Sequence, residues 1–123
     1  MPVTAATAVV HGQEVERSVI QRLEAAGVEC APLLDGGGTY CQVSFADGSS
    51  IRWSGTDRRG KDVSARHPVG EHGSLSGTWH SEDENHQEDF LFAAGVYSDD
   101  SADLVAYIIA RADRHGRAPA STL

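Results

Sequence analysis

Residues 40–54 have the sequence YCQVSFADGSSIRWS, and this stretch decides the fold. Apolar and polar residues alternate on both sides of Asp47-Gly48, which is typical of two half-buried strands joined by a tight turn. Two lengths of connection are compatible with this pattern. A two-residue Asp-Gly loop pairs Val43 with Arg52, and so sets an apolar side chain opposite a charged one.

A three-residue loop, residues 46–48, instead keeps the apolar side chains of both strands on one face. Register follows the buried face, because a slip of one residue turns every side chain to the other side of the sheet. The sequence therefore predicts the three-residue loop, with Gly48 in the left-handed position of a type I turn with a bulge. The apolar pairs expected from this register are Cys41 with Trp53 and Val43 with Ile51.

Amphipathic helices are predicted on both sides of the strands. The first covers residues 13–26 and ends at Gly27, which can adopt the left-handed conformation. The second opens at residues 98–101, with Asp100 as its N-cap, and stops at Gly116. Each has one apolar stripe with spacings of three and four: Val15, Val19, Ile20, Leu23 and Ala26 in the first, and Leu104, Val105, Ile108, Ile109 and Ala112 in the second.

Other segments complete the predicted order. Residues 28–34 are apolar but contain Pro32, which indicates an edge strand or an irregular lead-in. Residues 75–80 predict a third strand. Residues 90–97 are apolar throughout, and their length and aromatic content favour a central strand over a buried helical turn. The polar, glycine-rich residues 56–74 predict a long mobile loop.

These elements predict one α+β domain over residues 12–116, a two-layer sandwich in the order α-β-β-β-β-α. An antiparallel meander of three or four strands carries both helices on one face, because the helices and the sheet must each bury an apolar side. Residues 1–11 are expected to be flexible and residues 117–123 to form a disordered tail. The opposite sheet face is left for solvent or a partner, with the polar side chains Gln42, Ser44, Arg52, Ser76, Thr78 and His80.

Charge and composition limit the function. The chain has 123 residues, 18 acidic and 10 basic, for a net charge of −8, which argues against a protein that coats nucleic acid or an anionic membrane. No apolar run of about 18 residues is present, and no Lys or Arg precedes Arg17, as a secretory signal requires. We therefore expect a cytoplasmic protein in which Cys30 and Cys41 stay reduced. The abundance of Ala, Gly and Val, with one Lys, is typical of a high-GC genome.

Four histidines are candidate metal ligands. His67 and His72 lie in the predicted loop, and His80 and His86 flank an acidic run. Imidazoles and carboxylates suit a divalent metal, and a metal-dependent hydrolase around these residues is one alternative function. Their spacing matches no H-E-x-x-H motif. The simpler interpretation is that they are solvated loop residues, with no bound metal and no cofactor.

Two charged segments are candidate partner-binding surfaces. Residues 82–103 include eight carboxylates and no Lys or Arg, which indicates a solvated loop and helix start or a negative patch for a basic partner. The basic loop 58–66 supports the alternative of a nucleic-acid-binding module. The candidate residues are Arg52, Arg58, Arg59, Lys61 and Arg66 on the basic side and Glu82, Asp83, Glu84, Glu88 and Asp89 on the acidic side.

The helix–strands–helix order resembles the double-stranded RNA-binding fold, in topology alone. That fold holds phosphate with a lysine cluster at the start of its second helix. This chain has Asp99, Asp100 and Asp103 there, and these carboxylates would repel phosphate. The resemblance therefore adds little to the case for nucleic-acid binding.

The sequence contains no catalytic motif. Residues 73–77 have the glycine spacing of a nucleophile elbow, but Leu75 stands where the serine must be. We therefore expect a small, non-enzymatic regulatory or interaction module that binds a protein partner through the open sheet face and the acidic rim. A homodimer is a variant of this hypothesis, because an edge strand at 28–34 or 90–97 can pair with a second copy.

Overall fold

The structure, a computed structural model, describes residues 14–35, 38–62 and 67–117. Residues 1–11 and 118–123, predicted to be flexible or disordered, lie outside this part of the chain. The described elements follow the order helix, five strands, helix: α2 (Val15–Ala25), β1 (Ala31–Asp35), β2 (Gly38–Ser44), β3 (Ser50–Asp57), the short 3₁₀ helix η1 (Val69–Glu71), β4 (His72–His80), β5 (Gln87–Phe92) and α3 (Tyr97–His115).

The strands form one antiparallel meander in which each strand pairs with the next along the chain. The predicted α+β class and the helix–meander–helix order are confirmed, although the sheet has five strands rather than three or four. The additional strand is β1, residues 31–35, which pairs with β2 as a regular edge strand despite Pro32.

The β2–β3 register is the predicted one. Cys41 lies opposite Trp53 and Val43 opposite Ile51. The turn is closed by the Phe45 N–H, which donates to the Ser49 carbonyl over 2.9 Å, so three residues connect the strands. Gly48 has a φ of +89°, the left-handed conformation that a residue with a side chain rarely adopts.

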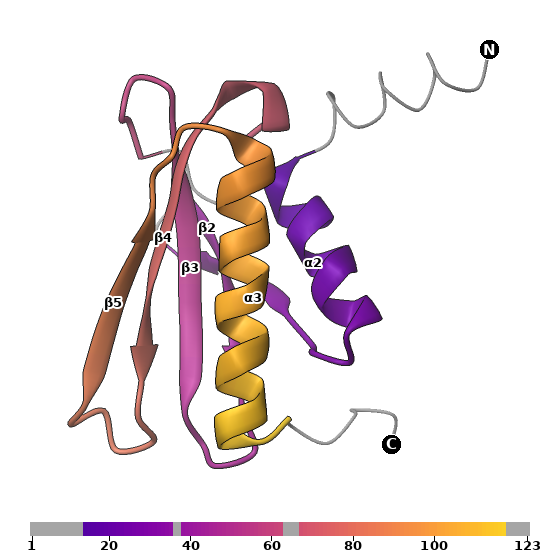
Figure 1. The fold of residues 1–123 in the computed structure, drawn as a ribbon. Helices are drawn as coiled ribbons and strands as arrows, with labels where there is room; N and C mark the ends of the chain where they lie inside the picture. The colour runs from indigo at the N-terminus through magenta and orange to yellow at the C-terminus, as the bar shows by residue number, and fades with distance from the viewer. Residues whose placement is uncertain (1–13, 36–37, 63–66, 118–123) are drawn as a thin grey trace.

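Both helices pack on one face of the sheet, as Figure 1 shows, and the apolar core lies between the two layers. Burying one Val, Leu or Ile side chain contributes about 1.5–3 kcal/mol, so the stripes of the two helices are the main reason that they dock here. The buried set is Val15, Val19 and Leu23 from α2, Cys41, Val43, Ile51, Trp53 and Leu75 from the sheet, and Leu104, Ile108 and Ala112 from α3.

No described helix covers the opposite sheet face (Figure 1), which carries the predicted polar side chains together with the exposed Leu91 of β5. A row of four side chains crosses it in register: Gln42, Arg52, Thr78 and Asp89. The Arg52 Nε–H donates to Gln42 over 3.0 Å, and the Thr78 hydroxyl donates to Asp89 over 2.8 Å. Cross-strand hydrogen bonds therefore order this face although it is solvated.

The last strand differs from the expectation for residues 90–97. β5 covers Gln87–Phe92 and is an edge strand, not a central one. Its aromatic residues Phe90 and Phe92 pack against the core, whereas Leu91 between them is 63% exposed. An edge strand beside a single helix layer has only one face to bury, so an apolar run here is not buried on both sides.

The connection between β3 and β4 is also shorter than predicted. Residues 56–57 belong to β3 and residues 72–74 to β4, so the link covers 58–71 and includes η1. The Thr56 and Ser74 hydroxyls lie 2.7 Å apart across the two strands. Polar composition alone made these strand ends resemble a loop.

We predict that Gly77→Ala lowers the free energy of unfolding by about 2 kcal/mol, the usual cost of overpacking a core. A Cβ at this position would lie 2.2 Å from the Arg52 carbonyl oxygen and 2.6 Å from the Phe90 ring. Urea denaturation measures the change. Gly60→Ala is the control, because its Cβ meets nothing within 4 Å and costs only the left-handed backbone strain, about 1 kcal/mol. Equal effects of the two substitutions would contradict the packing argument.

Candidate functional site

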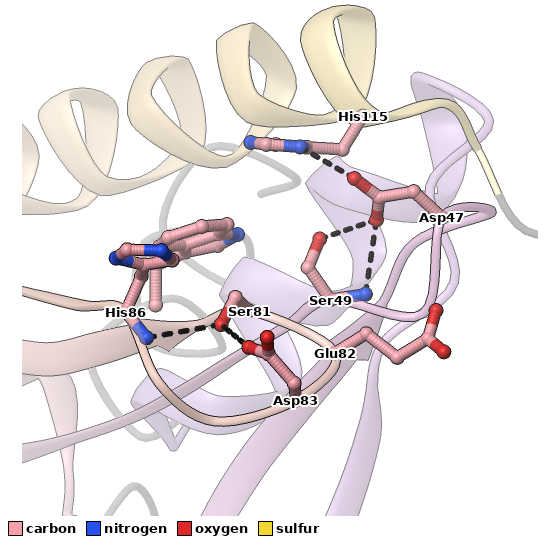
Figure 2. A pocket seen from close by; sticks show the side chains of 8 residues that line it. Asp47, Ser49, Ser81, Glu82, Asp83, His86 and His115 are labelled. Carbon is pink, nitrogen blue, oxygen red and sulfur yellow. Dashed lines mark hydrogen bonds and ion pairs between the residues drawn. The ribbon is translucent and has the colours of Figure 1, made fainter.

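A pocket of about 360 Å³ opens at one end of the sheet. The β2–β3 turn, the β4–β5 hairpin and the last turn of α3 meet there, and Figure 2 shows the side chains that they contribute. We name it the hairpin pocket, and its lining residues are Asp47, Ser49, Trp79, Ser81, Glu82, Asp83, His86 and His115. Three of these residues are carboxylates, and two are histidines from different elements.

Asp47 ties the β2–β3 turn to the end of α3. Its Oδ1 accepts the backbone N–H and the hydroxyl of Ser49, over 2.9 and 2.5 Å. Its Oδ2 accepts the Nδ1–H of His115 over 2.7 Å. The Ser49 hydroxyl, assisted by the Ser49 backbone and His115, lowers the pKa of Asp47 below its ordinary value. His115 is the last residue of α3, where the helix dipole favours a positive charge.

A second carboxylate orders the β4–β5 hairpin. Asp83 accepts the Ser81 hydroxyl over 2.7 Å and the Asn85 N–H over 3.0 Å, and these bonds lower its pKa. The Ser81 oxygen in turn accepts the His86 N–H over 3.1 Å (Figure 2). Glu84 takes a left-handed conformation at this tip, with a φ of +60°. The hairpin is therefore shaped by its own hydrogen bonds before any partner is present.

Trp79 forms the aromatic side of the pocket. Its ring stacks on His115, with centroids 5.0 Å apart, and the Arg111 guanidinium carbon lies 4.8 Å from the ring centre. Arg111 also forms an ion pair with Glu88, and this pair lowers the pKa of Glu88. The Tyr107 hydroxyl donates to the same carboxylate over 3.0 Å. One guanidinium thus lies between aromatic rings and a glutamate, behind the pocket wall.

The acidic candidates divide into two groups. Glu82 and Asp83 line the hairpin pocket, and Glu84 lines a neighbouring hollow of about 180 Å³ on the open sheet face. Glu82 and Glu84 are exposed, and neither side-chain carboxylate forms a hydrogen bond or ion pair within the described part of the chain. Glu88 is engaged by Arg111 on the helix side and Asp89 by Thr78 on the open face. The structure therefore gathers three of the five predicted carboxylates at the hairpin tip.

The basic candidates do not form one surface. Arg58, Arg59 and Lys61 lie in the β3–β4 connection, at the end of the sheet opposite the hairpin pocket. There the Asp57 carboxylate accepts the backbone N–H groups of Arg59 and Lys61. Arg52 lies six residues earlier along β3, roughly 20 Å away at the usual strand rise. Arg66 lies outside the described residues.

The four candidate metal ligands are also divided. His72 and His80 are the two ends of β4, which places them roughly 26 Å apart. His67 contacts His72, and His86 lines the hairpin pocket near His80. Among the residues that the structure describes, no group of three or more His, Cys, Asp or Glu side chains is arranged to hold a metal ion.

A buried chain of three polar side chains was not anticipated. Nε2 of His72 lies 2.7 Å from Oδ2 of Asp100, and Nδ1 of His72 lies 3.2 Å from Nε2 of His67. The three side chains belong to residues that are only 4%, 3% and 1% exposed, for His67, His72 and Asp100. The interpretation of these two histidines as solvated loop residues is therefore wrong.

Asp100 is also not the N-cap of α3. The N-cap is Val96, and Asp100 lies in the first turn. Its carboxylate accepts the N–H groups of Ala94 and Gly95, in the bend that precedes the helix, as well as the His72 ring. Because Asp100 is the acceptor, Nε2 of His72 carries a proton, and in neutral His72 the Nδ1 atom accepts from His67.

The buried chain joins the elements that meet at this end of the molecule. The His67 carbonyl accepts the Val15 N–H at the start of α2 over 2.9 Å. The Tyr97 ring lies edge-on to His72, and its hydroxyl donates to Ser18 of α2. The cluster is enclosed by packed elements and contributes to stability. His72 and Asp100 are 28 residues apart in the sequence, so no local pattern indicated their contact.

Comparison of the chain with protein-family models, curated proteins and solved structures found no match. Neither described helix has the length and apolar character required to cross a membrane.

Asp100→Ala is expected to lower the free energy of unfolding by about 3 kcal/mol, because it leaves two backbone N–H groups and a buried imidazole without their acceptor. Urea denaturation at neutral pH measures the loss. Asp103→Ala, at an exposed position of the same helix, should change stability by less than about 0.5 kcal/mol. A loss as small for Asp100 as for Asp103 would contradict the structural role of the buried chain.

Asp47→Ala should destabilise the protein in a pH-dependent way. A carboxylate whose pKa is lowered by folding stabilises the folded state above its ordinary pKa, about 3.8, and this contribution is lost as pH falls through the lower folded pKa. The difference in melting temperature between the native protein and the variant should therefore be full at pH 6 and shrink in more acidic solution. Asp113→Ala, which removes an exposed carboxylate that pairs with Arg117, provides a comparison. A difference that does not change with pH would count against this assignment.

Proposed function

We propose that this chain is a small cytoplasmic interaction module that binds a positively charged segment of a partner protein at the hairpin end of its sheet. The observation that carries the proposal is that the carboxylates of Glu82 and Glu84 have no hydrogen-bond or ion-pair partner among the described residues. Both residues are exposed. The other carboxylates nearby all form hydrogen bonds or ion pairs within the fold: Asp47, Asp83, Glu88 and Asp89.

Rigidity of the hairpin supports the same proposal. Asp83, Ser81 and the Asp47–His115 pair hold the carboxylates of the two adjoining turns in place. A preformed surface loses little conformational entropy on binding. The net charge of −8 also favours encounter with a basic partner, since electrostatic complementarity raises association rates.

The open sheet face extends this binding surface. The hollow that Glu82 and Glu84 line also includes Arg52 and His80 from β3 and β4. It joins the hairpin tip to the polar row that crosses the sheet. A partner segment can thus continue from the hairpin onto the open face, where Gln42 and Thr78 offer hydrogen-bonding groups.

Two buried cysteines without a disulfide fit the proposed compartment. Cys30 and Cys41 form no disulfide and are both enclosed by the core. Reduced thiols are the rule in a cytoplasm.

Selection from a random peptide library, with the full chain as bait, tests the proposal. The selected peptides should be enriched in Arg and Lys, and their affinity should fall as salt concentration rises. The double variant Glu82→Gln/Glu84→Gln should weaken binding about fivefold or more.

The matched control for this experiment is Glu24→Gln/Asp103→Asn. It removes the same charge from exposed positions on the two helices. Selected peptides without a positive bias, or equal binding losses in the two double variants, would refute the proposed function.

A further inference from the structure

We infer that the open sheet face of this chain binds a second copy of the same chain and forms a symmetric, reversible dimer. The inference goes beyond the proposed function, because it concerns the sheet face rather than the hairpin tip. It stands on a protruding leucine, a hollow and two opposite charges, which have the same spacing across the strands.

The leucine and the hollow belong to one row of the open face. Register aligns Ser54, Ser76 and Leu91 across β3, β4 and β5, and Leu91 is 63% exposed. Two strands away from Leu91, the same row contributes to a hollow of about 280 Å³, which we name the central hollow. Its lining residues are Tyr40, Arg52, Trp53, Ser54, Ser76 and Gly77. An exposed apolar side chain and a hollow lined in part by small residues thus share one face.

The neighbouring row carries opposite charges at the same spacing. Arg52 lies on β3 and Asp89 on β5, and Thr78 of β4 lies between them. Arg52 donates to Gln42, and Asp89 accepts from Thr78. A guanidinium has five N–H donors and a carboxylate about four acceptor positions. Both charged groups can therefore form a further ion pair and keep these internal hydrogen bonds.

A twofold axis that runs along β4, parallel to the strands, brings these features together. Such an axis sets β3 of one copy over β5 of the other and keeps each row at its own level. Leu91 then faces the central hollow of the other copy, and Asp89 faces Arg52. A twofold interface contains each of these contacts twice. Sheets that pack face to face keep their strands within about 30° of each other, so the aligned rows are compatible with ordinary sheet packing.

Small side chains along the axis let the two sheets approach. Leu75 is buried in the core, so its neighbours on β4, Ser74 and Ser76, project from the open face together with Thr78. In the dimer each of these residues lies near its own equivalent. The long side chains, Arg52 and Leu91, lie to either side of the axis, where each faces a complementary group of the other copy.

The extent of the face indicates a weak dimer. The strands β2 to β5 are about 4.8 Å apart and about 20 Å long, so the face measures roughly 500 Å² in each copy. A stable interface buries about 800 Å² per partner, and smaller ones are typical of transient complexes. The net charge of −8 also opposes the encounter of two copies, although physiological salt screens this repulsion. We therefore expect the dimer at high protein concentration.

Partner binding and self-association use the same face. A partner segment that continues from the hairpin past Gln42 and Thr78 occupies surface that the dimer covers. The two states are therefore alternatives, and the dimer forms where the face is free.

Sedimentation equilibrium of the full chain, from micromolar to millimolar concentration in physiological salt, tests the inference and should show a monomer–dimer equilibrium. Leu91→Ser should weaken dimerisation about tenfold or more, because two buried leucine contacts are lost. Val96→Ser is the matched control, since it removes an exposed apolar side chain at the start of α3, outside the strands. A chain that stays monomeric throughout, or equal losses in the two variants, would overturn the inference.

Two charge reversals test the facing pair. Arg52→Glu or Asp89→Arg alone places like charges opposite each other in both halves of the dimer, and each should weaken association about tenfold or more. In an equimolar mixture of the two variants, each altered side chain faces an opposite charge on the other copy. The mixture should therefore associate with close to native affinity, although neither variant does so alone. A mixture that associates as weakly as the separate variants would contradict the proposed pairing.

Discussion

The pairing register of β2 and β3 is the constraint on which the rest of the structure depends. It sets Cys41 opposite Trp53 and Val43 opposite Ile51, so that a single sheet face is apolar. Both helices bury their stripes on that face, and the reverse face remains polar as a consequence. Gly48 permits the three-residue turn that produces this register. A shift by one residue would move the whole apolar set away from α2 and α3.

The features that were predictable from the sequence are those that leave a periodic pattern of apolar residues along the chain. The apolar stripes that begin at Val15 and Leu104 predict both helices. The alternation of apolar and polar residues around Asp47 predicts the strand pair and its turn. Periodicity was less informative for residues 90–97, where an apolar run was interpreted as a central strand. The structure places Phe90 and Phe92 against the core and Leu91 in solvent, because an edge strand in a two-layer fold has one buried side.

The site was only partly predictable, for a physical reason. Glu82 and Asp83 were identified because a run of carboxylates is visible in the sequence. Their neighbours Asp47, Trp79 and His115 come from other elements, and only the tertiary fold brings these segments together. The contact between His72 and Asp100 is of the same kind. A polar residue in a polar loop gives no local sign that it will be buried, so histidines that stabilise the fold resembled solvated ones.

Arg111 lies behind the wall of the hairpin pocket and also attaches β5, since its guanidinium contacts the lining residue Trp79 and pairs with Glu88 of the outer strand. One side chain thus supports the pocket wall and also holds the outer strand. During evolution, a replacement of Arg111 would therefore disturb the support of Trp79 and the attachment of the outer strand together. Recognition is expected to diversify through the hairpin tip, where replacements leave the architecture intact, rather than through the helix behind it.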